Sequence, residues 1–556
     1  MITNLAHGPQ LRIAEEIHKQ KYRLVGESFR ESVSRVAAVL GETPEHFKDF
    51  RQLLLEQYFL PAGRVQSAIG SPQKITAFNC FVSGSIPDSM DGIMDRAKEA
   101  AQTMRLGGGI GYDFSTIRPR EALITTLASK ASGAVSFMEI FNAICATVSS
   151  AGERRGAQMG VLRVDHPDIE EFIEAKTNDT RLLQFNISIG ITDEFMDAVL
   201  SDSAFHLKFN GVIYKTVSAK ALFDRIMRST WDWAEPGVLF IDQINRMNNL
   251  YYCEDISATN PCGEQPLPPY GACLLGSFNL PKVTSEDRTF EFQKAIPVIV
   301  RAMDNVIDNT VYPLHQQELE AKSKRRIGLG VTGLANALER YAGPYGSESF
   351  LKASASVFKT LVESAYKASI DLAKEKGAFP LFDRDKYLAS NFVMGLSDEI
   401  QQGIYDHGIR NSHLISFAPA GTISITADNV SSGIEPVFSY QYDRTMITPD
   451  GPITETIQDY SYRMFGIKGK SANECSIDDH LNVLALASQY SDSAVSKTIN
   501  VGEHVTWSEF KDIYIRAWQM GCKGCTTFRA SGKRYGVLNE GSACYIDKET
   551  GAKTCG

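Results

Sequence analysis

The sequence predicts an α/β protein in which strands and helices alternate along one continuous domain. Short apolar runs that contain glycines, Phe78–Val82 and Leu106–Gly111, are typical of strands and flank the helical pattern of Met90–Met104. The same alternation returns in the period-two run Phe185–Ile191 and the helical pattern of Ala221–Trp233. No fixed-period repeat or low-complexity linker interrupts it, which favours one large domain over a string of small ones.

The composition excludes several classes of protein. The 556 residues are 43% hydrophobic and 22% charged, as in an ordinary globular protein, and the formal net charge of −9 argues against a nonspecific nucleic-acid binder. The N-terminus lacks the pattern of a signal peptide, and no apolar run is long enough to span a bilayer. We therefore expect no nucleic-acid or membrane partner and a cytoplasmic location.

Three parts of the chain differ in texture. Residues 1–60 are charged and carry apolar residues at helical spacing, so we expect an N-terminal helical region. Residues 61–530 carry the alternating strands and helices of the catalytic domain. Residues 531–556 are polar and rich in glycine and lysine, which predicts a flexible C-terminal tail.

Ten cysteines in a cytosolic chain indicate catalytic, redox or metal roles rather than static disulfides. Cys522 and Cys525 have the spacing of zinc ligands, so these two with Cys544 and Cys555 are one candidate zinc site. Alternatively, Cys544 and Cys555 shuttle electrons by thiol–disulfide exchange. We favour the shuttle, because zinc sites usually supply a second close pair and ten residues separate Cys544 from Cys555.

The segment Asn260-Pro-Cys-Gly-Glu264 concentrates an amide, a thiol and a carboxylate in five residues. In an extended backbone, which Pro261 favours for the residue before it, Asn260, Cys262 and Glu264 would project to the same side. That arrangement is typical of a reaction centre. A loop around a buried structural cysteine has the same composition, so the segment alone leaves both interpretations open.

Three further segments suit nucleotide groups, each with a simpler alternative. Ala418–Ser424 supplies a glycine, hydroxyls and backbone N–H groups, which fits an anion at a helix N-terminus or an ordinary hydroxyl-rich turn. Glu153–Gly160 places two arginines beside glycines, which fits a phosphate or base contact or a solvated turn. Asp88 precedes a helical pattern and can cap that helix or accept a hydrogen bond from a ribose.

Taken in order, eight segments resemble the catalytic chain of ribonucleotide reductases over roughly residues 55–530. They are Asn79-Cys80, Gly107–Gly111, Arg154–Gly160, Asn260–Leu267, Gly271–Leu280, Ala418–Ser424, Gly433–Pro436 and Gly521–Arg529. The resemblance implies a ten-stranded α/β barrel with a central finger loop that carries a radical-bearing cysteine. It also implies reduction of ribonucleotides to 2′-deoxyribonucleotides for DNA synthesis.

The resemblance assigns a role to each residue of the expected centre. It implies that Cys262 is the thiyl radical that abstracts the ribose 3′ hydrogen, Glu264 the base for the 3′ hydroxyl, and Asn260 a hydrogen-bonding partner of the substrate. Cys80 and Cys273 match the dithiol that reduces the 2′ position, with Cys80 helping the hydroxyl to leave as water. We assign re-reduction of the resulting disulfide to the tail cysteines, fed by a thioredoxin-like protein.

The resemblance also implies binding sites and partners. The segment matched to the substrate phosphates is Pro419, Ala420, Gly421, Thr422, Ile423 and Ser424. The residues matched to a site for a deoxynucleoside or nucleoside triphosphate effector are Asp88, Ser89 and Arg118, with Arg154 and Arg155 in the loop that communicates with substrate. A ribonucleoside diphosphate or triphosphate substrate and a homodimer are both compatible with it.

The source of the radical is inferred from missing motifs. Members that receive it from a metal-bearing partner subunit have two adjacent tyrosines where this chain has Thr526-Thr-Phe-Arg529, and the glycyl-radical motif of the anaerobic class is absent at Thr554-Cys-Gly556. We therefore expect the adenosylcobalamin-dependent class II. Without an Asp-x-His-x-x-Gly motif, cobalamin should bind with no histidine ligand from this chain, and we expect no protein metal site.

Two alternatives remain. One is a class I α subunit with a divergent relay that depends on a metal-bearing partner. The other is a nucleotide-binding, zinc-stabilised protein without reductase activity, in which Cys80, Cys262, Cys273 and Glu264 would have no purpose.

Overall fold

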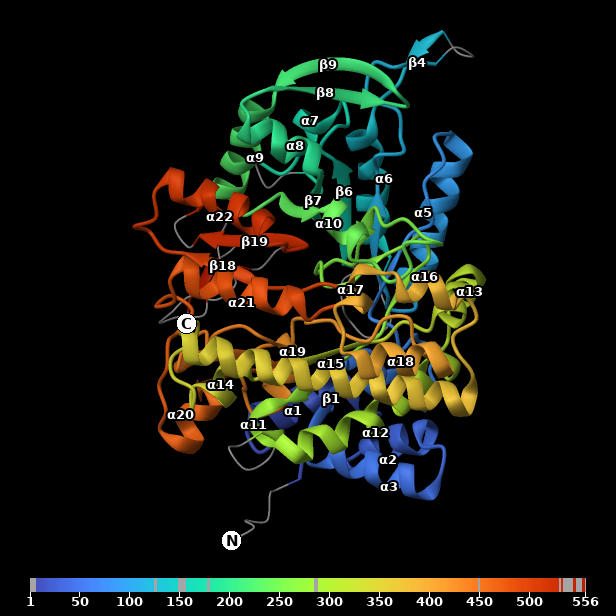
Figure 1. Ribbon diagram of the computed structural model, residues 1–556. Coiled ribbons are helices and arrows are strands. Elements are labelled where there is room, and N and C mark those ends of the chain that lie inside the picture. Colours follow the sequence, from blue (N-terminus) through green and yellow to red (C-terminus); the bar gives the residue numbers. More distant parts are fainter. Residues whose placement is uncertain are drawn as a thin grey trace.

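The computed structural model is a mixed α/β protein with two sheets and helices around both (Figure 1). It describes residues 7–124, 128–148, 157–177, 181–284, 289–448, 451–529, 532–533, 544–546 and 553–555. The α/β class predicted from the sequence is confirmed.

The larger sheet has eight strands in the order β13-β2-β3-β6-β7-β10-β19-β18. Its central strands β2, β3, β6, β7 and β10 are parallel, and β13 and β19 join them antiparallel. The bounds are Ala272–Cys273 (β13), Cys80–Val82 (β2), Gly109–Asp113 (β3), Gln158–Arg163 (β6), Phe185–Ile191 (β7), Gly237–Phe240 (β10), Gly524–Arg529 (β19) and Thr498–Val501 (β18).

The second sheet has the order β1-β14-β15, with bounds Phe59–Pro61, Leu275–Asn279 and Gly328–Thr332. Isolated parallel bridges continue it from Leu329 to Ile415 and from Phe417 to Val495. At one side β13 runs directly into β14, and at the other Val495 precedes β18. The two sheets therefore adjoin at both ends through the chain itself.

Five two-stranded ladders complete the strands of the described residues. They are β4 and β5 (Leu123–Ile124, Ser129–Lys130), β8 and β9 (Ala204–Phe209, Val212–Ser218), β11 and β12 (Ala258–Thr259, Pro266–Leu267), β16 and β17 (Gln441–Thr448, Gly451–Gln458), and β20 and β21 (Cys544–Ile546, Lys553–Cys555).

Helices cover both sheets, and several begin with reciprocal side-chain caps, as at Ser28 with Glu31 and Thr506 with Glu509. The first group is α1 (Arg12–Tyr22), α2 (Phe29–Leu40), α3 (Pro44–Leu55) and α4 (Gly63–Ala68). The helices between residues 90 and 246 are α5 (Met90–Arg105), α6 (Ala134–Thr147), α7 (Ile169–Glu174), α8 (Asp193–Leu200), α9 (Ala219–Trp233) and α10 (Ile241–Arg246). The remaining helices are α11 (Leu280–Val283), α12 (Thr289–Asp308), α13 (His315–Lys324), α14 (Leu334–Leu338), α15 (Glu348–Lys376), α16 (Arg384–Leu388), α17 (Asn391–Met394), α18 (Asp398–His407), α19 (Gly421–Thr426), α20 (Tyr460–Phe465), α21 (Ile477–Gln489) and α22 (Trp507–Gln519).

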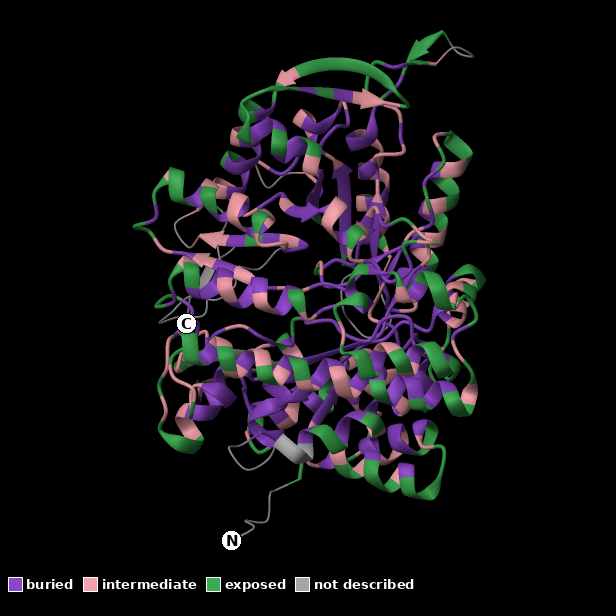
Figure 2. Cartoon of the chain, viewed as in Figure 1, coloured by how far each residue is buried: buried purple, intermediate pink, exposed green. Residues whose placement is uncertain are grey.

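Two large apolar cores lie on the two sheets, and each core with its sheet and helices makes up one half of the molecule. Buried residues run through the interior of both halves (Figure 2). One core joins the eight-stranded sheet to α5–α9, α21 and α22. The other joins the second sheet to α12, α15 and the N-terminal helices α2 and α3. The helical content predicted for the N-terminus is confirmed, and these helices share a core with the catalytic part. The domain boundaries stay predictions.

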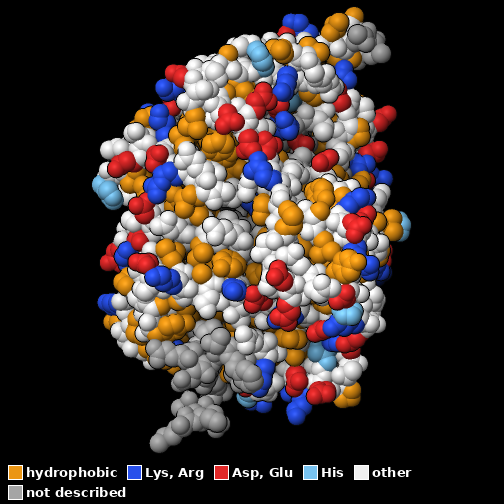
Figure 3. All heavy atoms as spheres, viewed as in Figure 1, with side chains coloured by type: hydrophobic (Ala, Val, Ile, Leu, Met, Phe, Trp, Pro, Cys, Tyr) orange, Lys and Arg blue, Asp and Glu red, His pale blue; other side chains and the backbone are white. Residues whose placement is uncertain are grey.

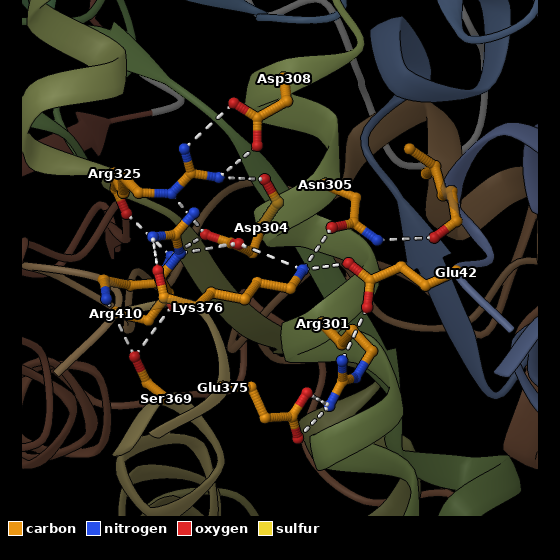
Figure 4. Close-up of polar contacts among 12 residues, drawn as sticks. Glu42, Arg301, Asp304, Asn305, Asp308, Arg325, Ser369, Glu375, Lys376 and Arg410 are labelled. Atoms are coloured by element: carbon orange, nitrogen blue, oxygen red, sulfur yellow. Dashed lines mark hydrogen bonds and ion pairs between the residues drawn. The ribbon is translucent and has the colours of Figure 1, made fainter. Parts of the chain in front are cut away.

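A buried ionic network ties helices of the second half together around Asp304 on α12 (Figure 4). The fully buried Asp304 carboxylate accepts hydrogen bonds from Arg325 Nε at 2.8 Å, Asn411 Nδ2 at 2.9 Å and Arg410 Nε at 3.2 Å. Arg325 also pairs with Asp308. The network fixes the end of α13 and the segment after α18 against α12.

The same network reaches the N-terminal helices through Glu42, in the turn between α2 and α3. Its carboxylate pairs with Lys376 at the end of α15 and with Arg301 of α12. Acidic and basic side chains are interspersed on the molecular face in Figure 3, as expected where exposed charges pair locally.

Most strands and helices expected from the sequence are present. The helical patterns at 90–104 and 221–233 are α5 and α9, and the period-two run at 185–191 is β7. No helix within the described residues is long and apolar enough to cross a membrane.

We expect Asp304→Asn to lower the free energy of unfolding by about 3–5 kcal/mol, because it leaves buried guanidinium groups without their shared carboxylate. Chemical denaturation measures this change. Asp371→Asn is the matched control on α15, where Asp371 pairs with Lys374 at the surface. That variant should change stability by less than about 1 kcal/mol, and equal losses for both would contradict the role of the buried network.

Candidate active site

The segment Asn260–Gln265 forms the tip of the hairpin β11–β12. Ala258 pairs with Leu267 and Thr259 with Pro266, so the six residues between the strands make the turn. Strand β11 lies against β3 and β6 of the eight-stranded sheet. The hairpin therefore carries its tip across the parallel strands rather than out to solvent.

The tip is a turn that the Asn260 side chain closes. Asn260 Oδ1 accepts the backbone N–H groups of Gly263 at 3.1 Å and Gln265 at 3.0 Å. Gly263 has φ +84°, a conformation that glycine adopts without a steric penalty. The prediction of an extended backbone here is wrong, because these hydrogen bonds stabilise a turn instead of alternating side chains.

The turn still brings the amide and the carboxylate together. Asn260 Nδ2 donates to Glu264 Oε1 at 2.8 Å, and both side chains are buried. Burial raises the pKa of Glu264 to about 7, against the opposing hydrogen bonds from its own backbone and Asn260. Within the described residues, Glu264 Oε2 has no hydrogen-bond partner. One carboxylate oxygen is therefore available to a substrate hydroxyl.

Cys80 and Cys273 are register partners on the neighbouring antiparallel strands β2 and β13. Cys273 is fully buried, and burial raises the pKa of its thiol well above 9, with smaller contributions from Cys80, Glu264 and Cys262. Asn260 Nδ2 lies 4.0 Å from Cys273 Sγ. The structure thus gathers all five residues expected at the centre, with the Cys273 sulfur in its protonated form.

Glycines on β3 allow this close approach. A Cβ on Gly109 would stand 3.1 Å from Cys80 Sγ and 3.3 Å from Pro261 Cγ. A Cβ on Gly111 would stand 1.8 Å from the Thr259 carbonyl oxygen. The hairpin therefore rests directly on the backbone of β3. The glycine-rich run was visible in the sequence, but its packing against Thr259 was not.

A cavity of about 280 Å³ opens beside the exposed Cys262. It is bounded by the hairpin tip, by β7 and β10, by β19 and by the segment that precedes β18. Its lining residues include Asn186, Ser188, Pro419, Lys497, Cys525 and Thr526. Sequence reasoning missed Asn186, although it is the one exposed residue on the otherwise buried β7, and it considered Cys525 only as a candidate zinc ligand.

The backbone of Glu264 is anchored on the opposite side of the turn. Its carbonyl oxygen accepts Ser416 Oγ at 2.9 Å and the N–H of Ala494 at 3.0 Å. The segment 491–493, which directly precedes Ala494, is itself held by the buried Lys523. The Lys523 ammonium donates to the carbonyls of Ser491 at 3.0 Å and Ser493. Two segments distant in sequence thus fix the position of the carboxylate.

The expected phosphate segment leads into α19, which begins at Gly421 with Ala420 at its N-cap. The Ala420 N–H donates to Ser432 Oγ at 3.0 Å, which fixes the entry to the helix. A Cβ on Gly421 would meet nothing within 4 Å, and Pro419 lines the cavity beside Cys262. The segment therefore borders the centre and leaves space above Gly421.

The expected effector residues are partly together. Asp88 Oδ2 accepts Arg118 Nε at 2.8 Å, and Asp88 Oδ1 accepts the Arg118 N–H at 3.1 Å. Ser89, not Asp88, is the N-cap of α5, since its hydroxyl accepts the Gly92 N–H. Capping by Asp88 is thus wrong. Arg154 and Arg155 lie outside the described residues.

The C-terminal cysteines occupy two environments. Cys522 and Cys525 are buried, and burial raises the pKa of both thiols. Cys544 and Cys555 are register partners across the ladder β20–β21, so the backbone places them opposite each other. Among the residues searched in the described structure, no three His, Cys, Asp or Glu side chains gather as a metal site.

The sequence matches the barrel domain of ribonucleotide reductases over residues 78–528. The chain belongs to this family. The resemblance recognised in the sequence is therefore confirmed.

Several vitamin B12-dependent reductases are similar to this family member. A vitamin B12-dependent ribonucleoside-diphosphate reductase of Thermoplasma acidophilum is 34% identical over 84% of this chain, which spans 62% of that protein. One of Mycobacterium tuberculosis is 33% identical over 90% of the chain, which spans 74% of it. A vitamin B12-dependent ribonucleotide reductase of Streptomyces clavuligerus is 27% identical over 91% of the chain, which spans 62% of it.

We expect Gly111→Ala to lower turnover at least tenfold, because the added methyl would displace Thr259 and the hairpin that carries Cys262. Steady-state assays and thermal unfolding measure the effect. Gly190→Ala on β7 is the matched control, since its Cβ would have 3.8 Å to the nearest atom. Normal turnover in Gly111→Ala would contradict the close packing.

Proposed function

We propose that this protein reduces ribonucleotides to 2′-deoxyribonucleotides by thiyl-radical chemistry, with adenosylcobalamin as cofactor. The observation that carries the proposal is the register pair of Cys80 and Cys273 beside the Asn260–Glu264 hydrogen bond, with Cys262 on the same turn. A radical carrier, a base and a two-electron donor are the groups that this reaction requires. The names of the B12-dependent relatives support the cofactor and the class II assignment.

The chain's own residues divide the reaction into balanced steps. The Cys262 thiyl radical takes the 3′ hydrogen atom, forming an S–H bond and leaving a carbon radical. Glu264 Oε2 accepts the 3′ hydroxyl proton, which weakens the neighbouring C–OH bond at the 2′ carbon. The Cys80 thiol supplies the proton with which the 2′ hydroxyl leaves as water. The Cys273 thiol supplies the hydrogen of the new C–H bond at the 2′ carbon, and Cys80 and Cys273, having given two electrons in all, join as a disulfide. Glu264 returns its proton to the 3′ oxygen, and Cys262 returns the hydrogen atom to the 3′ carbon.

The cavity beside Cys262 opens the sulfur to a radical-generating cofactor, whose reactive part would lie there. When bound, adenosylcobalamin would supply the acceptor for the hydrogen atom that the Cys262 thiol loses on becoming a thiyl radical. Residues Asn186, Ser188 and Thr526 would border it. The described residues that line this cavity include no tyrosine, and Thr526 occupies one of the two positions where a partner-fed relay would place one. The class I alternative is therefore not favoured.

The substrate and effector assignments rest on the resemblance and on local geometry. Pro419–Ser424 would hold the phosphates, supported by the space above Gly421. The relatives' names favour a ribonucleoside diphosphate. Asp88, Ser89 and Arg118 would bind the triphosphate effector, and the chain would act as a homodimer.

The tail and the barrel complete the proposal. Cys544 and Cys555 would reduce the Cys80–Cys273 disulfide and be reduced by a thioredoxin-like protein, supported by their cross-strand pairing. The two sheets would form the ten-stranded barrel, supported by their adjacency at β13–β14 and near Val495. The hairpin β11–β12 would be its finger loop.

We expect turnover of a ribonucleoside diphosphate under anaerobic conditions only when both adenosylcobalamin and a dithiol are present. Chromatographic detection of the 2′-deoxy product measures it. Cys262→Ser should abolish turnover, because serine does not form a comparable radical. Turnover without cobalamin, or turnover that requires a metal-bearing subunit, would contradict the proposal.

A separate arm tests the tail. Replacing Cys544 and Cys555 by serine should abolish turnover with thioredoxin while a small dithiol, which reaches the centre directly, still supports it. Equal losses with both reductants would assign these cysteines another role.

The pH dependence should report Glu264. Because the base acts only when ionised and burial raises the pKa of Glu264 to about 7, kcat/KM should fall as pH drops through about 7 and be full above it. A pH series with saturating cofactor measures this limb. Glu264→Gln should abolish nearly all activity, and any residual activity should not show this fall in kcat/KM below pH 7. An acid limb near pH 4 would show that the carboxylate is not buried during catalysis.

A further inference from the structure

Asn186 makes a direct hydrogen bond to the turn that carries Cys262, and both residues line the same cavity. It lies on β7 opposite Met159 of β6, and its Nδ2 donates to the Pro261 carbonyl oxygen at 3.1 Å. Asn186 also lines the cavity into which Cys262 opens. On a strand whose other residues are all buried, this exposed amide is directed to the residue next to the reactive sulfur.

The shape of the turn is fixed by hydrogen bonds within it. Asn260 Oδ1 holds the N–H groups of Gly263 and Gln265, so the relative positions of these residues are set within the turn itself. What remains free is the orientation of the whole turn. That orientation depends on the contacts from the turn to the surrounding sheet.

Hydrogen bonds hold the turn on each side of Cys262, in addition to the packing of Pro261 and Thr259 on Gly109 and Gly111. On the C-terminal side, the Glu264 carbonyl is held by Ser416 Oγ and the Ala494 N–H. On the N-terminal side, Pro261 has no N–H group, so its carbonyl is the only backbone polar group that it offers to a tether. Asn186 supplies that tether.

We propose that Asn186 is a positioning residue that holds the Cys262 sulfur at the distance and angle required for hydrogen-atom transfer. The inference deepens the proposed function and rests on it. Without the Asn186 hydrogen bond, the turn would pivot about the two hydrogen bonds at the Glu264 carbonyl oxygen. This rotation would displace Cys262 most and Glu264 least. The base and the substrate-binding residues keep their places.

Hydrogen-atom transfer depends steeply on geometry, and a displacement of about 1 Å in a reacting group costs on the order of 10²-fold in rate. A single neutral hydrogen bond contributes about 1 kcal/mol to stability, so its loss should not unfold the protein. Asn186 therefore combines a small expected effect on stability with a large expected effect on the chemical step.

Asn186→Asp is the informative variant, since it keeps the shape and removes the N–H donor. With saturating cofactor, we expect kcat to fall about 10- to 100-fold while KM for the ribonucleotide stays within about twofold. Asn186→Ala should behave alike, which separates loss of the donor from the added charge. A kcat within twofold of wild type in both variants would overturn the inference.

A second readout does not need turnover. Maleimide labelling followed by mass spectrometry gives the rate at Cys262 relative to Cys253, which is also exposed and serves as an internal reference. Release of the turn should change the Cys262 to Cys253 ratio at least threefold in both Asn186 variants. An unchanged ratio would overturn the inference, whether or not the enzyme turns over.

The matched control is Asn391→Asp, because Asn391 Nδ2 likewise donates to a backbone carbonyl, that of Arg246, at 2.8 Å and away from the cavity. It should leave both kcat and the labelling ratio at wild-type values. If the wild-type protein shows no cobalamin-dependent turnover, the proposed function fails. A changed labelling ratio would in that case still establish the tether.

Discussion

The geometry of the candidate active site depends on the hydrogen bonds of the Asn260 side chain. Its oxygen closes the turn by accepting two backbone N–H groups, and its nitrogen holds the Glu264 carboxylate at 2.8 Å. A primary amide is the neutral side chain that can accept and donate at once with both groups in one plane. Aspartate would lose the donor, and leucine of similar size would lose both. One residue therefore sets the turn and the direction of the Glu264 carboxylate.

The turn is supported from both halves of the molecule. On the side of the eight-stranded sheet, the hairpin rests on Gly109 and Gly111, where no side chain intervenes. On the other side, Ser416 and the turn clamped by Lys523 hold the Glu264 backbone. Burial lowers the pKa of Lys523 to about 8, a cost that three backbone carbonyls offset. Contacts from both halves of the molecule therefore set the position of this hairpin.

Much of the fold and of the centre could be predicted from the sequence, because these parts have local signals. The strand Phe185–Ile191 and the helix at 90–105 follow hydrophobic periodicity, and the cysteines and Glu264 follow motifs in a fixed order. What failed was local geometry set by a competing hydrogen bond. Asn260 closes a turn where proline predicted extension, and Ser89 caps α5 in place of Asp88. Asn186 carries no motif, because its partner lies 75 residues away in the sequence.

The cross-strand pairing of Cys544 and Cys555 bears on how electrons would be delivered in the proposed shuttle. Fourteen residues separate Arg529, the last residue of β19, from Cys544, and a chain of that length reaches at most about 50 Å. A dithiol tethered at this range meets its target at an effective concentration on the order of millimolar. Delivery from such a tether would be intramolecular, so its rate would be independent of enzyme dilution. Only the reduction of a Cys544–Cys555 disulfide would depend on the concentration of the external reductant.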